Sequence, residues 1–174
     1  MKPLTVVAPH ISEPSFEKTL LSLVSSDLVE RAVVVSHEPA HLKMKNCDVL
    51  IGSLSSCKTL SLILDRIRTE HLLLLQGTQR ISIEPEALHK LTRMAEGTQA
   101  GLVFSDFYEE SDQGKILRPL NDYQSGSVRD DFDFGSMTLF SVPAIRKALK
   151  PAMICPIFYT IKFWKLILLF LPRP

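Results

Sequence analysis

Polar side chains that could hold a ligand stand at four points where an apolar run of this 174-residue chain ends. The four polar segments are 9–10, 36–38, 76–78 and 105–106. Carboxylate, hydroxyl, amide and imidazole groups of this kind can form hydrogen bonds with a polar ligand. The sequence holds no nucleophile elbow, phosphate-binding glycine loop, zinc signature or Rossmann glycine fingerprint. The candidate site is therefore built from these four segments.

The apolar runs before these segments have the pattern of strands that alternate with helices. Strands are predicted at 4–8, 31–36, 48–51, 71–75, 101–105 and 137–140. Helical spacing of apolar residues predicts helices at 14–24, 56–68, 85–97 and 142–149. The runs 71–75 and 100–104 are almost wholly apolar, as inner strands buried on both faces must be. In the helix that opens at Pro85, we expect Leu88, Leu91 and Met94 to face the core.

Strands separated by helices of this length indicate βαβ units with right-handed crossovers. The predicted fold class is α/β, a three-layer sandwich with a mainly parallel central sheet. We expect one domain at 1–150 and an apolar C-terminal tail at 151–174. Open α/β sheets bind their ligands outside the carboxyl ends of the strands. The four polar segments follow strands at those ends, so the fold would bring them to one edge.

Composition and charge favour a soluble globular protein, because 45% of the residues are hydrophobic and 22% are charged. The net charge of +1 argues against nucleic acid as a partner. Cys47, Cys57 and Cys155 lie far apart and are expected to be buried thiols in a reducing compartment. The N-terminus runs straight into a strand pattern without a signal peptide, so a cytoplasmic location is expected.

The segment from Ile157 to Leu171 is apolar apart from a threonine and two lysines, and it is short for a membrane span. Lys162 and Lys165 beside Phe163 and Trp164 suit a helix lying on the inner face of a membrane. A helix that packs on the core, or a tail produced by a frameshift, would explain the same residues. These three interpretations stay open at the level of sequence.

After Asp106 the sequence becomes polar and turn-like, and 115–127 is predicted to be a long connection. It leads to the densest acidic group of the chain, Asp130, Asp131 and Asp133. These carboxylates could bind a cation or orient an acceptor hydroxyl, and Asp131 is the candidate catalytic residue. The structural alternative is an exposed strand or turn whose alternating phenylalanines pack inward.

The order of the elements, Pro9 after the first strand, and the segments 101–106 and 129–136 together resemble glycosyltransferase family 2. The resemblance covers about residues 4 to 149 and is closest to divergent bacterial members with the GT-A fold. It implies transfer of a sugar from a nucleotide-sugar donor to a glycan or lipid-linked acceptor.

By this resemblance, the loop after the first strand and an acidic residue after the second would hold the nucleotide. Carried over by position, these residues are Pro9, His10, Ser36 and Glu38. A carboxylate such as Glu38 can accept two hydrogen bonds from ribose hydroxyls or a base edge. The alternatives are a solvated turn in which Glu38 is free in water, and histidines at 10 and 37 that belong to ordinary loops.

The family binds Mn²⁺ or Mg²⁺ through an aspartate-x-aspartate motif after the fourth strand, where this chain has Gln76, Gly77 and Thr78. Gln76 and Thr78 offer neutral oxygens in the donor site, which bind a hard cation more weakly than carboxylates do. Either no metal is used, or another carboxylate such as Asp106 is the metal ligand, or the site no longer catalyses; the sequence leaves these three open.

The family's general base should follow the segment that resembles 135–149, but no acidic residue occurs after Lys150. We therefore expect a truncated or altered glycosyltransferase-like protein with weak or no transfer activity. The alternative is a non-catalytic interaction or membrane-docking module. A nucleotidyltransferase of similar topology is a third interpretation, disfavoured because the first loop lacks a glycine-rich, basic signature.

Overall fold

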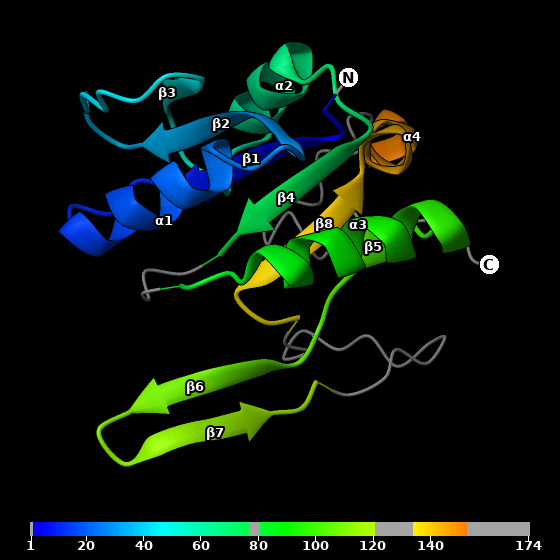
Figure 1. Cartoon of the computed structure of the whole chain (residues 1–174). Coiled ribbons are helices and arrows are strands. Elements are labelled where there is room, and N and C mark those ends of the chain that lie inside the picture. The colour runs from blue at the N-terminus through cyan, green and yellow to red at the C-terminus, as the bar shows by residue number, and fades with distance from the viewer. Residues whose placement is uncertain (1, 77–80, 121–133, 153–174) are drawn as a thin grey trace.

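The computed structural model describes residues 2–76, 81–120 and 134–152, and shows a six-stranded sheet with helices on both faces (Figure 1). The strands of this sheet are β1 (Leu4–Pro9), β2 (Val29–Ser36), β3 (Cys47–Ile51), β4 (His71–Leu75), β5 (Leu102–Val103) and β8 (Met137–Ser141). Their order across the sheet is β3-β2-β1-β4-β8-β5. The β1–β2, β2–β3 and β1–β4 pairs are parallel, and β8 runs antiparallel to both β4 and β5.

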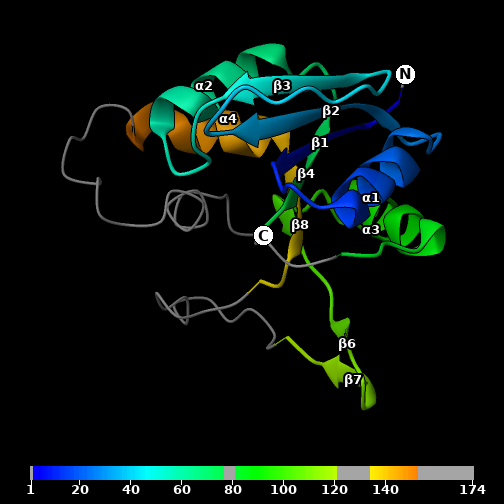
Figure 2. The same ribbon diagram turned by 90° about the vertical axis from the view of Figure 1, so that its left-hand side faces the viewer.

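The helices form the two outer layers of the sandwich. They are α1 (Pro14–Val24), α2 (Cys57–Arg66), α3 (Pro85–Thr98) and α4 (Val142–Ala152). Helices α2 and α4 cover one face of the sheet, and α1 and α3 cover the other (Figure 2). The three-layer α/β fold with a mainly parallel sheet, predicted from the sequence, is confirmed.

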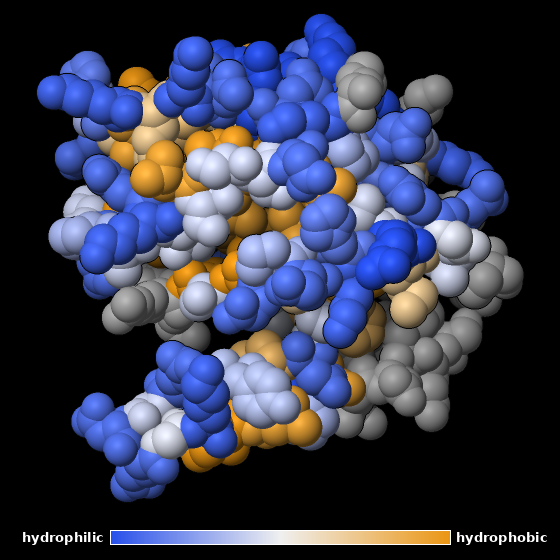
Figure 3. Space-filling view, in the orientation of Figure 1, coloured by the Kyte–Doolittle hydropathy of each residue, from blue (hydrophilic) through white to orange (hydrophobic). Residues whose placement is uncertain are grey.

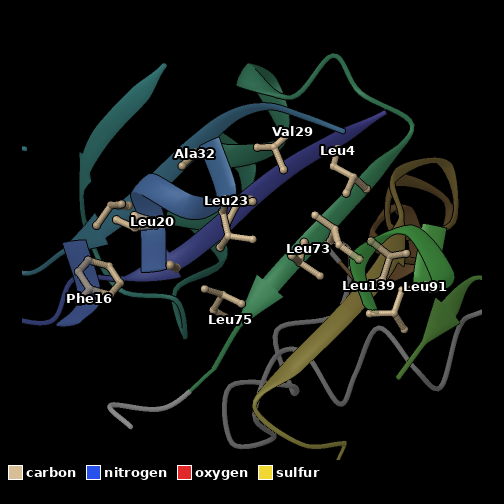
Figure 4. Packing of buried hydrophobic residues seen from close by; sticks show 14 of the residues in the cluster. Leu4, Phe16, Leu20, Leu23, Val29, Ala32, Leu73, Leu75, Leu91 and Leu139 are labelled. Carbon is tan, nitrogen blue, oxygen red and sulfur yellow. The ribbon is translucent and has the colours of Figure 1, made fainter. Parts of the chain in front are cut away.

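Strand β4 lies in the middle of the sheet, and all five of its residues are buried. Its side chains alternate between two apolar clusters, with Leu72 and Leu74 facing α2 and α4. Leu73 and Leu75 face α1 and α3, where they pack with Phe16, Leu20 and Leu91 (Figure 4). A strand that is buried on both faces has to be apolar on both, which explains the leucine run.

Local sequence sets the helix ends. Pro14 and Pro85 open α1 and α3, where the fixed φ of proline suits the first turn and its missing N–H costs nothing. The side chain of Ser56 caps α2 by accepting the Thr59 N–H. Helix α3 stops before Gln99, which has a left-handed φ of 52°.

The structure corrects three expectations about these elements. Met94 does not face the core, since its side chain is 56% exposed and Ala95 is buried instead. The run at 100–104 is not an inner strand, because β5 is a two-residue edge strand with half-buried residues. Cys57 is exposed at the start of α2 rather than buried.

The region predicted to be turns and a long connection contains a hairpin instead. Strands β6 (Phe107–Ser111) and β7 (Gly114–Arg118) pair with each other in a separate two-stranded sheet. Figures 1 and 2 show this hairpin projecting away from the central sheet. The sequence pattern missed it because nearly all of its residues are exposed, so apolar and polar positions do not separate by face.

Within the described ranges, the chain forms no helix that is both long enough and apolar enough to cross a bilayer. The apolar segment 157–171 lies outside the residues that the structure describes.

Candidate functional site

The carboxyl ends of β1 and β2 are tied together by backbone hydrogen bonds. Pro9 lies opposite Val35 in the β1–β2 register, and the His10 N–H donates to the Val35 carbonyl at 2.7 Å. The His10 ring lies edge-on to Phe16 of α1, with ring centroids 6.1 Å apart. Two of the predicted nucleotide-binding residues, Pro9 and His10, therefore sit on a rigid strand end rather than in a free loop.

Ser36 ends β2 and joins it to the end of β3. Its carbonyl accepts the Gly52 N–H at 2.8 Å, and its side-chain oxygen accepts the Glu38 N–H at 3.3 Å. Ser36 is buried, while Glu38 is exposed. The structure thus brings Ser36 and Glu38 to the same edge as Pro9 and His10.

The turn after β3 belongs to this edge, although sequence reasoning gave it no role. A Cβ on Gly52 would lie 2.4 Å from the Thr59 side-chain oxygen, so only glycine fits there without movement. The same oxygen accepts the Ser53 N–H at 3.2 Å. A glycine followed by serines and a helix cap was the available signal for a tight strand-to-helix turn.

Gln76 follows β4 and contacts the start of β8. Its backbone N–H donates to the Ser136 carbonyl at 2.7 Å, and its Nε2 lies 3.4 Å from the Thr138 side-chain oxygen. Because β8 is antiparallel to β4, its first residues lie at the same edge as the carboxyl ends of the parallel strands. Ser136 and Thr138 were not predicted as site residues, since no local pattern shows that this strand returns beside β4.

Asp106 follows β5, and one of its carboxylate oxygens is already engaged. Oδ1 accepts the Leu120 N–H at 2.7 Å, which links the residue before β6 to the chain after β7. In the described part of the chain, no three His, Cys, Asp or Glu side chains gather closely enough to hold a metal ion. The role of Asp106 as a metal ligand stays a prediction.

Two predicted site residues, Thr78 and Asp131, lie outside the described residues, as do Asp130 and Asp133. Phe134, which follows this acidic cluster, is buried and lies edge-on to Phe104 with ring centroids 5.2 Å apart.

Two groups with perturbed pKa values lie at the opposite edge of the sheet. Burial lowers the pKa of His71, at the amino end of β4, and the carboxylates of Glu70 and Glu96 partly oppose this shift. Burial and the neighbouring Asp48 carboxylate raise the pKa of the Cys47 thiol, at the amino end of β3. A raised pKa keeps Cys47 protonated near neutral pH, which agrees with a structural role for that cysteine.

The edge at the carboxyl ends of β1 to β4 can accept hydrogen bonds from a polar ligand and donate hydrogen bonds to it. It presents a carboxylate at Glu38, an imidazole at His10 and a side-chain amide at Gln76. The backbone N–H groups of His10 and Gln76 bond to neighbouring segments of the sheet, and that of Glu38 bonds to the Ser36 side chain. Open α/β sheets bind their ligands outside the carboxyl ends of their strands, so this edge is the candidate site.

No protein-family model matches the chain, and no curated protein matches it in sequence. Solved structures do share its fold. The 4-diphosphocytidyl-2C-methyl-D-erythritol synthase of Anaerococcus prevotii superposes with a TM-score of 0.56 at 11% identity, covering 97% of this chain and 82% of its own.

The 2-C-methyl-D-erythritol 4-phosphate cytidylyltransferase of Thermus thermophilus gives a TM-score of 0.57 at 11% identity, covering 98% of this chain and 86% of its own. The enzyme of the same name from Francisella tularensis superposes with a TM-score of 0.55 at 10% identity, covering 98% of this chain and 88% of its own. The chain therefore has the α/β fold of these cytidylyltransferases, which is GT-A-like as the sequence predicted.

Proposed function

We propose that this chain binds the nucleotide part of a nucleotide-sugar at the carboxyl edge of its sheet. The observation that carries the proposal is the meeting of Pro9, His10, Ser36, Glu38 and Gln76 along one edge, on backbones fixed by hydrogen bonds. The likeness of the fold to enzymes named as cytidylyltransferases supports a nucleotide as the ligand.

In this proposal the exposed carboxylate of Glu38 accepts hydrogen bonds from the ribose hydroxyls or the base. Pro9 and His10 line the nucleotide, and Ser36 fixes the turn that carries Glu38 through its bond to the Glu38 N–H. Gln76 and Thr78 contribute neutral polar groups near the diphosphate. The reaction implied by the resemblance is transfer of the sugar to a glycan or lipid-linked acceptor.

We propose that transfer by this chain is weak or absent. A glutamine and a threonine stand where glycosyltransferases of this kind carry two aspartates, and neutral ligands hold Mn²⁺ or Mg²⁺ less strongly than carboxylates. In this proposal Asp106 is the ligand for either cation when the donor is bound, and the titration below tests this as well.

The test is calorimetric titration of the full chain with UDP- and GDP-sugars, with and without Mn²⁺. Millimolar or tighter binding is expected, and Glu38→Ala should weaken it about tenfold because a charge-assisted hydrogen bond is lost. Glu17→Ala, which removes an exposed glutamate from α1, is the matched control and should leave the affinity unchanged. No heat of binding with any of these nucleotide-sugars would refute the proposal.

A second candidate is cytidylyl transfer, as the names of the similar structures suggest. The loop 9–13 speaks against it, because its sequence Pro-His-Ile-Ser-Glu holds no glycine, lysine or arginine to cradle a triphosphate. Titration with CTP separates the two candidates. Binding of CTP that is tighter than binding of every nucleotide-sugar would favour cytidylyl transfer.

A further inference from the structure

The hairpin β6–β7 exposes a concentration of apolar side chains. Among the described residues, seven large hydrophobic side chains are exposed, and three of them are on the hairpin. They are Tyr108, Ile116 and Leu117, which are 65%, 47% and 49% exposed. Figure 3 shows apolar atoms on the hairpin, which stands apart from the body of the molecule. A two-stranded hairpin is marginally stable in water by itself, so this surface favours a partner.

The register places these side chains on both faces of the hairpin. Tyr108 lies directly opposite Leu117, so the two share one face. Ile116 lies opposite Glu109 on the other face. The charges beside them are paired within the hairpin, Lys115 with Glu110 and Arg118 with Glu109. Internal pairing leaves the apolar side chains as the groups that a partner would cover.

The outer edge of β7 is better suited to pairing with a strand than the outer edge of β6. Figures 1 and 2 show β7 as the strand farther from the central sheet. Along β6, an antiparallel copy centred on Glu109 would bring two glutamates face to face, with Glu110 beside them. Along β7, the sequence Lys115-Ile116-Leu117 brings no like charges into direct opposition when it pairs antiparallel with itself about Ile116.

The backbone of β7 fits the same arrangement. The two-residue turn Asp112–Gln113 makes Ser111 and Gly114 the closing pair of the hairpin, whose backbone groups face each other. Because the bonding direction alternates along a strand, Ile116 also points its N–H and C=O inward, toward Glu109. Lys115 and Leu117 therefore point theirs outward, as a second copy centred on Ile116 requires.

We propose that β7 is a docking edge for β7 of a second copy of this chain. The two strands run antiparallel about a two-fold axis at Ile116, and Lys115 of each copy exchanges backbone hydrogen bonds with Leu117 of the other. The result is a four-stranded sheet in the order β6-β7-β7-β6. It covers Ile116 with its own counterpart and gathers the Tyr108–Leu117 pairs of both copies on one face.

The first test is sedimentation velocity of the full chain over a range of concentrations. A dimer that dissociates on dilution is expected, and Ile116→Lys should raise its dissociation constant at least about tenfold, because two ammonium groups then meet at the axis. In its own chain the new lysine lies opposite Glu109, so the hairpin should persist. Met94→Lys, on a similarly exposed residue of α3, is the matched control and should leave the dimer intact.

A pair of proline variants tests which edge is used. Leu117→Pro removes an outward N–H from β7, which the hairpin does not need but the dimer does. Glu110→Pro removes an outward N–H from β6 and should leave the dimer in place. A monomer at every concentration up to about 0.1 mM, or a dimer lost with Glu110→Pro and kept with Leu117→Pro, overturns the proposal.

Crosslinking tests the register. In a chain with its three cysteines changed to serine, Ile116→Cys should form a disulfide between copies, since directly opposed residues without mutual hydrogen bonds have Cα atoms about 4.5 Å apart. Crosslinking through Glu109→Cys in place of Ile116→Cys would show that β6, not β7, forms the interface.

Discussion

Asp106 closes the base of the hairpin by accepting the Leu120 N–H at 2.7 Å. This bond joins the residue before β6 to the second residue after β7, so the two ends of the hairpin are held together. Beside it, an ideal Cβ on Gly135 would lie 3.3 Å from Leu120 and 3.5 Å from Phe107. The hairpin is therefore joined to the body of the molecule by a tightly packed neck, made of Asp106, Phe107, Leu120 and Gly135.

Two substitutions of Asp106 separate its structural role from a role in cation binding. Asp106→Ala removes the acceptor and should loosen the neck by about 1 kcal/mol, the usual net value of one hydrogen bond. Asp106→Asn keeps an oxygen acceptor without the charge. It should therefore keep the neck closed and weaken only the binding of a cation. Amide hydrogen exchange of residues 107–118 measures how readily the hairpin opens when the neck is loosened. Equal protection in the alanine variant and the parent chain would mean that the bond does not hold the hairpin.

The close approach of Gly52 to Thr59 predicts that Gly52→Ala destabilises the fold. The new methyl group would lie 2.4 Å from the Thr59 oxygen and displace it from the Ser53 N–H. A loss of about 1 to 3 kcal/mol in the free energy of unfolding is expected, as for other overpacked sites. Denaturant unfolding measures this loss.

Gly97 is the matched control for Gly52. A Cβ at Gly97 of α3 meets nothing within 4 Å, so Gly97→Ala should stabilise the chain by about 0.4 to 1 kcal/mol. If Gly52→Ala were as well tolerated as Gly97→Ala, the β3–α2 turn would be less constrained than its contacts indicate.

Stability should fall in mild acid because of His71. Its side chain is buried, and no described group bonds its Nδ1. Burial lowers the pKa of His71 in the folded state below its ordinary value near 6.5. The unfolded chain then binds the proton first, so stability is full above pH 6.5 and is lost as the pH falls from there toward the folded-state pKa.

Unfolding of the His71→Leu variant from pH 8 to pH 5 checks this assignment. The variant should show a shallower loss of stability with acid than the parent chain. His37→Gln removes an exposed imidazole and separates the effect of a buried ring from that of any histidine. An unchanged pH dependence in His71→Leu would assign the acid sensitivity to other groups.

The cysteines should differ in reactivity toward an alkylating reagent. Cys57 is exposed, whereas Cys47 is partly buried and burial raises the pKa of its thiol. Since the thiolate is the reacting form, Cys57 should be alkylated several-fold faster than Cys47 near neutral pH. Peptide mass spectrometry of samples quenched over time gives the two rates. Faster modification of Cys47 would show that the amino end of β3 opens in solution.

Periodicity was sufficient for the elements that pack on both sides, because burial selects apolar residues there. Strand β4 and the buried stripe of α2, made of Leu60, Ile63 and Leu64, were predicted for this reason. Met94 was misplaced because Met94 and Ala95 are adjacent on α3, and the pattern favoured the larger apolar residue. The hairpin escaped prediction because nearly all of its residues are exposed, so burial does not select apolar residues on one face of either strand.

The candidate site was predictable in its location and less so in its contacts. Topology alone brings Pro9, Ser36 and Gln76 to one edge, because Pro9 and Ser36 end parallel strands and Gln76 follows one. The bond from Gln76 to Thr138 spans 62 residues and depends on β8 returning antiparallel to β4. The bond from Asp106 to Leu120 depends on the hairpin, so neither contact has a local signal in the sequence.

The position of β4 between β1 and β8 has a consequence for the chain during synthesis. Strand β4 ends at residue 75, but its neighbour β8 begins at residue 137. Until β8 leaves the ribosome, one edge of a leucine-rich strand stays open, with backbone groups ready to pair with any other strand. The nascent chain therefore exposes an aggregation-prone strand edge over this interval, before the finished fold can protect it.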